Sequence, residues 1–274
     1  MAGAVERDSE GAEQTVDKEE RVPTAHSDGL KIFYEVSGDG PVLVLHPGMF
    51  QTGASWSAAG YAPRLRANHT VVAIDPPGLG ASDAPTDPAA YALERRVECV
   101  TAVLDDIGAD RAGVWGYSMG ALTALAMALH APERCARVVA GSWDPADGFA
   151  SARDHVFQQL GLPAETDAFD ILRQGARADP SQAAVIDAAD PAALRANYEA
   201  FSRDRALDAG LASSDVPMLM YCGTADPWHE PMRKVTERTS GSFFSVPGAD
   251  HRGGWVRSAE ILPRVLPFLA AGRW

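Results

Sequence analysis

The segment Gly116-Tyr117-Ser118-Met119-Gly120 carries the clearest sign of chemistry in the sequence. A serine with a glycine two residues to each side is typical of a strained turn that joins a strand to a helix and exposes the hydroxyl. The glycines let the two elements approach closely, and the start of the helix favours negative charge. Apolar runs at residues 112–115 and 121–129 flank the segment, as such a strand and helix would. We therefore predict that Ser118 is a nucleophile.

The best-placed base is His251. A serine hydroxyl is a weak nucleophile and needs a base that a third group holds in place. Of the seven histidines, His251 alone follows the last expected strand, in a loop before the final helix. Loops at the carboxyl ends of parallel strands are where catalytic groups gather. We predict that His251 is the general base and that the other histidines cap helices or lie on the surface.

Two aspartates compete for the role of the orienting acid. Asp226 follows the expected strand at residues 218–221, and Asp144 follows the one at residues 138–140. We favour Asp226 and keep Asp144 as the rival. Asp250 adjoins His251, and because the side chains of adjacent residues usually diverge, we do not assign it this role.

Short apolar runs alternate with helical patterns through most of the chain. Buried parallel strands appear as continuous apolar runs, and helices between them cover both faces of the sheet. We therefore predict an α/β fold with one mostly parallel, doubly wound sheet. The expected strands are residues 30–36, 42–45, 71–74, 112–115, 138–140, 218–221 and 243–246.

Residues 144–213 break this alternation, because they contain no convincing buried strand. They offer helices near residues 149–160, 168–178 and 191–206, separated by Asp-Pro and Gly-Leu-Pro breaks. We predict a helical insertion into a core made of residues 22–143 and 214–274. Residues 1–21 hold seven acids and three bases with few apolar residues, and are expected to form a disordered acidic tail.

The composition excludes several classes of protein. The 274 residues carry a net charge of −13, which repels nucleic acid and anionic membranes. The apolar stretch at residues 121–129 is shorter than the roughly 20 residues that a membrane helix needs. The start of the sequence lacks the pattern of a secretory signal, so we expect a cytoplasmic protein.

The sequence implies no cofactor and no metal. The three cysteines lack CxxC spacing, which argues against a zinc site or a disulfide framework and favours buried thiols. There is neither a phosphate-binding P-loop nor an HExxH motif. The segment Gly78-Leu79-Gly80 lacks the third glycine of a dinucleotide loop.

The turn at Ser118 and the loops that carry Asp226 and His251 together resemble the α/β-hydrolase fold superfamily. The resemblance covers about residues 26–143 and 214–270. The order Ser118, Asp226, His251 also matches that family. The resemblance implies that the helical insertion is a cap over the pocket. The nucleophile is Ser, whereas the dehalogenating and epoxide-opening branches use Asp there. The remaining motifs are His46-Pro47-Gly48, residues 75–82, residues 223–226 and residues 248–251.

The resemblance also implies an oxyanion hole. The family usually has His-Gly after its third strand, but Pro47 stands in the Gly position here and has no N–H. The first donor is therefore Gly48 or Met49, and the second is Met119, which follows the nucleophile. Such a donor is typically worth about 3 to 4 kcal/mol to the barrier. We interpret His46 as structural.

The expected reaction is acyl transfer on a small-molecule substrate. We predict hydrolysis of a carboxylic ester or lactone that is moderately sized and largely apolar. The same residues could instead serve thioester or amide cleavage, acyl transfer, carbon–carbon hydrolysis, cofactor-free perhydrolysis or a biosynthetic cyclisation. A non-catalytic ligand receptor and an interaction module that uses the acidic tail also stay open. Candidate pocket residues are Phe50, Trp56, Trp143, Phe149, Trp228 and Trp255.

Overall fold

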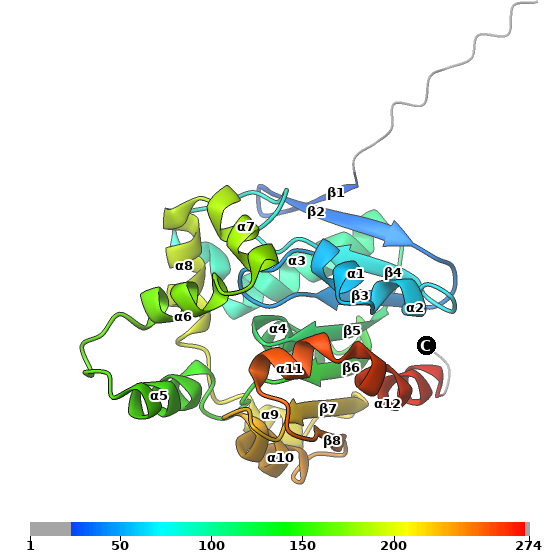
Figure 1. The fold of residues 1–274 in the computed structure, drawn as a ribbon. Coiled ribbons are helices and arrows are strands. Elements are labelled where there is room, and N and C mark those ends of the chain that lie inside the picture. Colours follow the sequence, from blue (N-terminus) through cyan, green and yellow to red (C-terminus); the bar gives the residue numbers. More distant parts are fainter. Residues whose placement is uncertain (1–22, 272–274) are drawn as a thin grey trace, which may run out of the picture.

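The structure, a computed structural model, describes residues 23–271. Within these residues the strands form one eight-stranded sheet in the order β1-β2-β4-β3-β5-β6-β7-β8 (Figure 1). The predicted acidic tail, residues 1–21, lies outside the described part. The strands are β1 (Thr24–Ser27), β2 (Leu30–Ser37), β3 (Val42–His46), β4 (Thr70–Ile74), β5 (Ala112–Tyr117), β6 (Cys135–Gly141), β7 (Met218–Gly223) and β8 (Ser242–Val246).

The neighbouring strands β4, β3, β5, β6, β7 and β8 are parallel to one another. The pairs β1–β2 and β2–β4 are antiparallel. The register places His46 beside Gly116 and Tyr117 beside Gly141. The carboxyl ends of β3, β5 and β6 therefore meet at one edge of the sheet. This is the edge at which the sequence predicts the catalytic residues.

Helices cover both faces of the sheet, because successive strand residues point to opposite sides. Leu45 and Trp115 join one buried cluster, and their neighbours Val44 and Val114 join the other. The predicted doubly wound α/β fold is thus confirmed. On the first side lie α1 (Ala54–Ala58), α2 (Ala62–Leu65), α11 (His251–Val256) and α12 (Ser258–Ala270); on the second lie α3 (Leu93–Asp106), α4 (Met119–His130) and α10 (His229–Thr236), with a 3-10 turn, η1 (Pro88–Tyr91), before α3.

Helix α4, which follows the candidate nucleophile, is apolar around most of its circumference. Residues 119–128 are all buried. This helix packs against β5 and β6 on one side and against α3 and α9 on others, so it has no solvated face for polar residues. Its position under the sheet edge is therefore fixed by packing over its whole length.

Between β6 and β7 the described chain holds only helices (Figure 1). Asp167, Asp179 and Asp190 each cap the helix that follows by accepting a backbone N–H bond. Two of these caps precede a proline at the first helical residue, so the Asp-Pro pairs start helices rather than merely breaking them. Helix α7, which begins at such a pair, was not predicted from the sequence for this reason. The helices are α5 (Phe149–Leu160), α6 (Ala168–Ala176), α7 (Pro180–Ala188), α8 (Pro191–Phe201) and α9 (Asp208–Ala212).

The insertion joins the core where residues 145–146 and 206–207 pair, and this junction is called the neck. Two backbone bonds of 2.8 Å, from Ala206 N–H to Ala146 O and from Leu207 N–H to Pro145 O, tie its returning segment to its outgoing one. The last helix, α9, lies beyond this neck and packs against α4 of the core. The four helices α5 to α8 are called the cap below.

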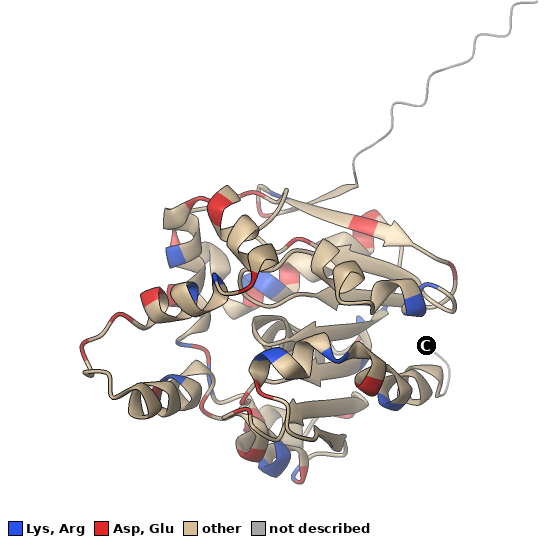
Figure 2. Ribbon diagram, in the orientation of Figure 1, with Lys and Arg blue, Asp and Glu red and all other residues tan. Residues whose placement is uncertain are grey.

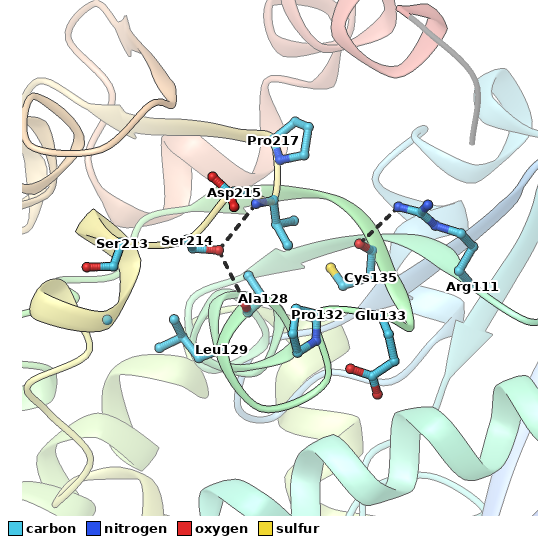
Figure 3. A pocket seen from close by; sticks show the side chains of 12 residues that line it. Arg111, Ala128, Leu129, Pro132, Glu133, Cys135, Ser213, Ser214, Asp215 and Pro217 are labelled. Atoms are coloured by element: carbon cyan, nitrogen blue, oxygen red, sulfur yellow. Dashed lines mark hydrogen bonds between the residues drawn. The ribbon is translucent and has the colours of Figure 1, made fainter.

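A groove of about 730 Å³ lies at the opposite edge of the sheet, where β5, β6 and β7 begin (Figure 3). Arg111, Cys135 and Pro217, which precede or start these strands, line it. The groove is therefore separated from the candidate nucleophile by the length of the strands. Both signs of charge are spread over core and cap (Figure 2).

Candidate active site

Ser118 lies on the sharp turn that the sequence predicts. Strand β5 ends at Tyr117 and helix α4 begins at Met119, with Ser118 between them at φ 56° and ψ −122°. A Cβ on Gly116 would overlap the carbonyl oxygen of Gly120, and a Cβ on Gly120 would overlap that of His46. The strand and helix can therefore cross this closely only because both positions are glycine.

His251 reaches this serine from the first residue of α11. Asp250 caps that helix by accepting a 2.7 Å bond from Gly253 N–H, which orients the first turn. The imidazole Nε2 lies 3.1 Å from Ser118 Oγ. The imidazole side chain is 42% exposed, so a substrate can approach it from solvent.

Asp226 lies on the other side of the imidazole, with its Oδ2 2.8 Å from His251 Nδ1. Its side chain is fully buried, and its Oδ1 accepts a 3.0 Å bond from Trp228 N–H. The rival acid, Asp144, instead accepts bonds from Ala146 N–H and the Ser151 hydroxyl, both at 2.9 Å. The structure therefore brings Asp226 to His251 and assigns Asp144 to the start of the insertion.

The charge state of Asp226 sets the tautomer of His251. Burial alone would raise the pKa of the Asp226 carboxyl, but the charge of His251 and the bonds from His251, Trp228 N–H and Ser142 outweigh it. The pKa of Asp226 lies below its ordinary value, so the group is a carboxylate at neutral pH. A carboxylate only accepts, so Nδ1 carries the proton of neutral imidazole and Nε2 is free to accept one from Ser118.

Three backbone N–H groups are candidate donors for the predicted oxyanion hole, those of Gly48, Met49 and Met119. Met119 is the first residue of α4, where an N–H has no partner within the helix. The Gly48 N–H donates to Gln51 Oε1 at 3.0 Å. Among the described residues Met49 N–H has no hydrogen-bond acceptor. Of Gly48 and Met49, Met49 is thus the one whose donor is available.

His46 is buried in the protein interior. Burial, together with the charge of Arg96, lowers the pKa of its imidazole to about 3, so His46 is neutral across the physiological range. Its Nδ1 lies 3.1 Å from Pro47 O. These contacts agree with a structural part for His46.

Four of the predicted pocket aromatics lie where the cap meets the core. The Phe50 ring is 6.2 Å from that of Phe169 on α6, and Trp143 is 5.2 Å from Trp228. Phe149 opens α5 and packs edge-on to Phe201 at 5.5 Å. The Trp228 indole also meets the His251 imidazole at 5.0 Å.

The other two predicted aromatics, Trp56 and Trp255, lie on the opposite face of the sheet. Their rings contact each other at 4.8 Å and pack with Tyr61 and Trp115 in the core. Trp56 is fully buried there. Helices α1 and α11 turn these side chains toward the sheet rather than toward the cap, so a pocket-lining role for them loses its structural support.

Three residues at the site were not singled out in the sequence. Gln51 occupies the Gly48 N–H, while Tyr117 and Ser142 lie behind the His251–Asp226 pair. Ser142 has a positive φ of 52° just after β6. An aromatic residue before the candidate nucleophile and a polar residue at a strand end were the only available signals.

Residues 23–271 contain no group of three or more His, Cys, Asp or Glu side chains placed to hold a metal ion. Cys99, Cys135 and Cys222 are buried free thiols. No described helix has both the length and the apolar character needed to span a membrane.

Comparison with known proteins gives consistent results. A family described as alpha/beta hydrolase fold matches residues 41–183. A protein of Variovorax paradoxus named as a carbamate hydrolase, RutD, is 28% identical over 260 residues, which cover 88% of this chain and 97% of that protein. Its namesake from Azorhizobium caulinodans is 29% identical over 149 residues, and that match spans only 55% of the relative's length.

The same architecture is found among solved structures. A hydrolase from Pseudomonas aeruginosa PA01 superposes with a TM-score of 0.74 at 26% identity. The superposition covers 90% of this chain and 97% of that one, so the resemblance extends over the cap as well as the sheet.

Proposed function

Because the chain belongs to the alpha/beta hydrolase fold family, we propose that it is a serine hydrolase that cleaves a carboxylic ester or lactone through an acyl-enzyme. The observation that carries this proposal is the unbroken chain of contacts from Ser118 Oγ to His251, at 3.1 Å, and from His251 to Asp226, at 2.8 Å. A nucleophile, a base and an orienting carboxylate in hydrogen-bond reach make up the machinery of acyl transfer.

In the proposed acylation step, Ser118 Oγ attacks the substrate carbonyl carbon while its proton moves to His251 Nε2. Asp226 stabilises the imidazolium that forms. The N–H groups of Met119 and Met49 hold the oxyanion of the tetrahedral intermediate. His251 then gives the proton to the leaving alcohol oxygen, and the carbon–oxygen bond breaks.

Deacylation repeats the sequence with water as the nucleophile. His251 takes a proton from the water as its oxygen attacks the acyl carbon, and the same two N–H groups hold the second oxyanion. His251 then returns the proton to Ser118 Oγ as the acid product leaves. In a lactone the alcohol and the acid remain in one product.

The aromatic residues between the cap and the core favour a substrate that is largely apolar and of moderate size. Phe50, Trp143, Phe149 and Trp228 gather at the boundary between cap and core, close to the His251 imidazole that Trp228 touches. Apolar and aromatic walls with few polar groups are typical of small-molecule sites. We propose that these four residues bind the acyl or the alcohol part.

A carbamate is the second candidate substrate. It is favoured by the relative of Variovorax paradoxus, which is named for that activity and matches along 88% of this chain. A carbamate also presents a carbonyl carbon to Ser118, so the same residues would act in the same order. The two candidates differ in the group that leaves and in the acyl-enzyme that water must release.

A panel of p-nitrophenyl esters of increasing chain length, with a p-nitrophenyl carbamate beside them, tests the proposal. We expect turnover of at least one ester and a loss of at least about 10⁴-fold in kcat for Ser118→Ala. Ser245→Ala is the matched control, because Ser245 Oγ also bonds a histidine Nε2, that of His229 at 2.8 Å rather than that of His251. Unchanged turnover in Ser118→Ala would refute the proposal.

Slow turnover of every ester by a folded protein whose Ser118 still reacts with an inhibitor would favour the thioester, amide, carbon–carbon or cyclisation chemistries. Tight binding of a small molecule with negligible turnover would favour a receptor.

A further inference from the structure

Tyr117 stands directly before the candidate nucleophile and touches the candidate base from behind. Its hydroxyl donates to the backbone carbonyl oxygen of His251 at 2.5 Å. Its ring also packs against the imidazole, with 5.3 Å between the centroids. One side chain therefore holds both the main chain and the ring of His251, across 134 residues of sequence.

The same hydroxyl also contacts a serine that influences the acid. It donates to Ser142 Oγ at 3.0 Å, and hydrogen bonding by the Ser142 side chain helps to lower the pKa of Asp226. Ser142 keeps a left-handed φ of 52°, which is uncommon for a non-glycine residue and places its hydroxyl between the two. Tyr117 thus joins the buried Ser142 to the main chain of His251 through one hydroxyl.

Packing leaves the Tyr117 ring little freedom to move. Tyr117 is only 2% exposed. A Cβ on Gly141 would lie 2.5 Å from its ring, and a Cβ on Gly254 would lie 2.6 Å from its hydroxyl oxygen. The sheet and α11 therefore close around the phenol, and burial raises its pKa well above the ordinary value, so that it stays a donor.

We propose that Tyr117 is a positioning residue that holds the His251 imidazole in line between Ser118 and Asp226. This inference rests on the proposed function, because it assigns Tyr117 a part in the reaction of the same site. Small misplacements of a catalytic group cost much of the advantage of a preorganised site. The phenol acts through His251 and needs no contact with the substrate.

The test is the Tyr117→Phe variant, which keeps the ring and removes the hydroxyl. His251 serves in both half-reactions, so we expect acylation and deacylation to slow by similar factors of about five to ten, with KM changed less than about twofold. Stopped-flow measurement with p-nitrophenyl acetate separates the burst from the steady state, and rates are expressed per active site titrated with a fluorophosphonate.

The control is Tyr221→Phe, which removes another buried phenol hydroxyl on β7, two strands away from β5. Tyr221 packs 6.1 Å from Tyr117, and its hydroxyl accepts from Trp115 Nε1 rather than contacting His251. We expect its rates per titrated site to match the wild type. If Tyr117→Phe also matches the wild type per site, the hydroxyl only stabilises the fold and the inference is overturned.

A second variant covers the case in which Tyr117→Phe does not fold. Gly254→Ala keeps the tyrosine but presses a methyl group on its hydroxyl, so it should lower both rates in the same way. Gly175→Ala in α6, which has open space around it, controls for a glycine replaced in a helix. Unchanged rates in Gly254→Ala would overturn the inference.

The wild type separates failure of the proposed function from failure of this inference. If the wild type forms no acyl-enzyme at Ser118, the proposed function fails, and this inference fails with it. If the wild type is acylated and the variants are unaffected, the inference alone is refuted.

Discussion

At the scale of single residues, the site depends on a buried carboxylate that stays ionised. Asp226 has a fully buried side chain, yet its bonds to His251, Trp228 N–H and Ser142 hold its pKa below the ordinary value. The desolvation of the charge is therefore offset by donors from three separate parts of the chain: the end of β6, the start of α10 and the first residue of α11. Burying the charged carboxylate lowers the stability of the fold, whereas the buried carboxylate fixes the tautomer of His251.

Asp226→Asn tests this balance. An amide beside Nδ1 no longer enforces the tautomer that leaves Nε2 as acceptor, so we expect kcat to fall roughly 10⁴-fold with the fold intact. Circular dichroism and the ester assay together check this. A kcat within about tenfold of the wild type would contradict the assigned role.

The same variant should change how stability depends on pH. The folded pKa of Asp226 is depressed, so the unfolded chain binds more protons in the range between the two pKa values. The stabilisation is complete above the ordinary value near 3.8 and is lost as the pH falls through the folded pKa. Urea unfolding of wild type and Asp226→Asn should therefore converge at acid pH, and a gap that stays constant down to pH 2 would contradict this.

At the scale of elements, the site is built where a strand and a helix cross with almost no space between them. The crossing needs glycine at both Gly116 and Gly120, because a side chain at either would overlap a backbone carbonyl. Helix α4 is buried over residues 119–128, so it cannot shift to make room. The turn that exposes Ser118 is thus rigid.

Gly120→Ala should therefore be severely destabilising, by about 3 kcal/mol or more. Gly175→Ala makes the same chemical change in α6, in open space, and should stabilise by up to about 1 kcal/mol. Thermal unfolding of the two variants measures the contrast. Equal effects at both sites would contradict the close crossing.

The segment that returns from the cap carries a poorly solvated charge. Burial raises the pKa of Asp204 to about 6, although the charge of Arg96 opposes the shift. Among the described residues, Asp204 Oδ2 has no hydrogen-bond partner. The folded state therefore binds more protons than the unfolded chain between about pH 4 and 6, and stability falls as the pH rises through this range.

Asp204→Asn should accordingly raise the free energy of unfolding at pH 7 by about 1 kcal/mol, a figure reduced for the partial exposure of the group. The gain should shrink as the pH is lowered from about 6 to about 4. Asp154→Asn, which changes an exposed carboxylate on α5, should show no such pH dependence. Urea unfolding at pH 4, 6 and 7 decides; a gain that is independent of pH would contradict the raised pKa.

At the scale of the whole molecule, the cap is held on the core by ties of unequal strength. Arg96 on α3 is 3% exposed, and burial lowers the pKa of its guanidinium to about 10. It donates to Asn197 Oδ1 on α8 at 2.7 Å and to Tyr91 O at 2.9 Å. On another flank Arg252, next to His251, meets Asp179 at 2.8 Å, with the arginine side chain 67% exposed.

These two ties should respond differently to mutation. Arg96→Leu leaves buried acceptors without donors, so we expect a loss of about 2 to 4 kcal/mol. Arg252→Gln removes an exposed pair and should cost no more than about 1 kcal/mol, a difference that about 1 M salt abolishes. Denaturant unfolding at low and high salt checks both, and a larger loss for Arg252→Gln would contradict this ranking.

The sequence predicted the features that depend on local pattern. The turn at Ser118, the strands around it and the order of the three candidate residues follow from glycine spacing and apolar runs, and the structure has them in place. The helices α5, α6 and α8 were foreseen within a few residues of their ends. Helix α7 was missed because its starting Asp-Pro pair resembles a break.

Features that depend on distant packing could not be predicted. Which face Trp56 and Trp255 occupy is decided by how α1 and α11 dock on the sheet. The sequence favoured Asp226 but left Asp144 open as the rival, since both follow strands, and only the geometry around His251 separates the two. The contact between Tyr117 and His251 spans 134 residues and has no local signature.

The central claim, that His251 activates Ser118, is tested most directly by the mass of the intact protein after reaction with a fluorophosphonate. We expect one adduct per chain, located on Ser118 by peptide mapping and absent from Ser118→Ala. We also expect its formation to slow by at least about 10³-fold in His251→Gln. A folded wild type with no adduct on Ser118, or an equal rate of labelling in His251→Gln, would contradict the account.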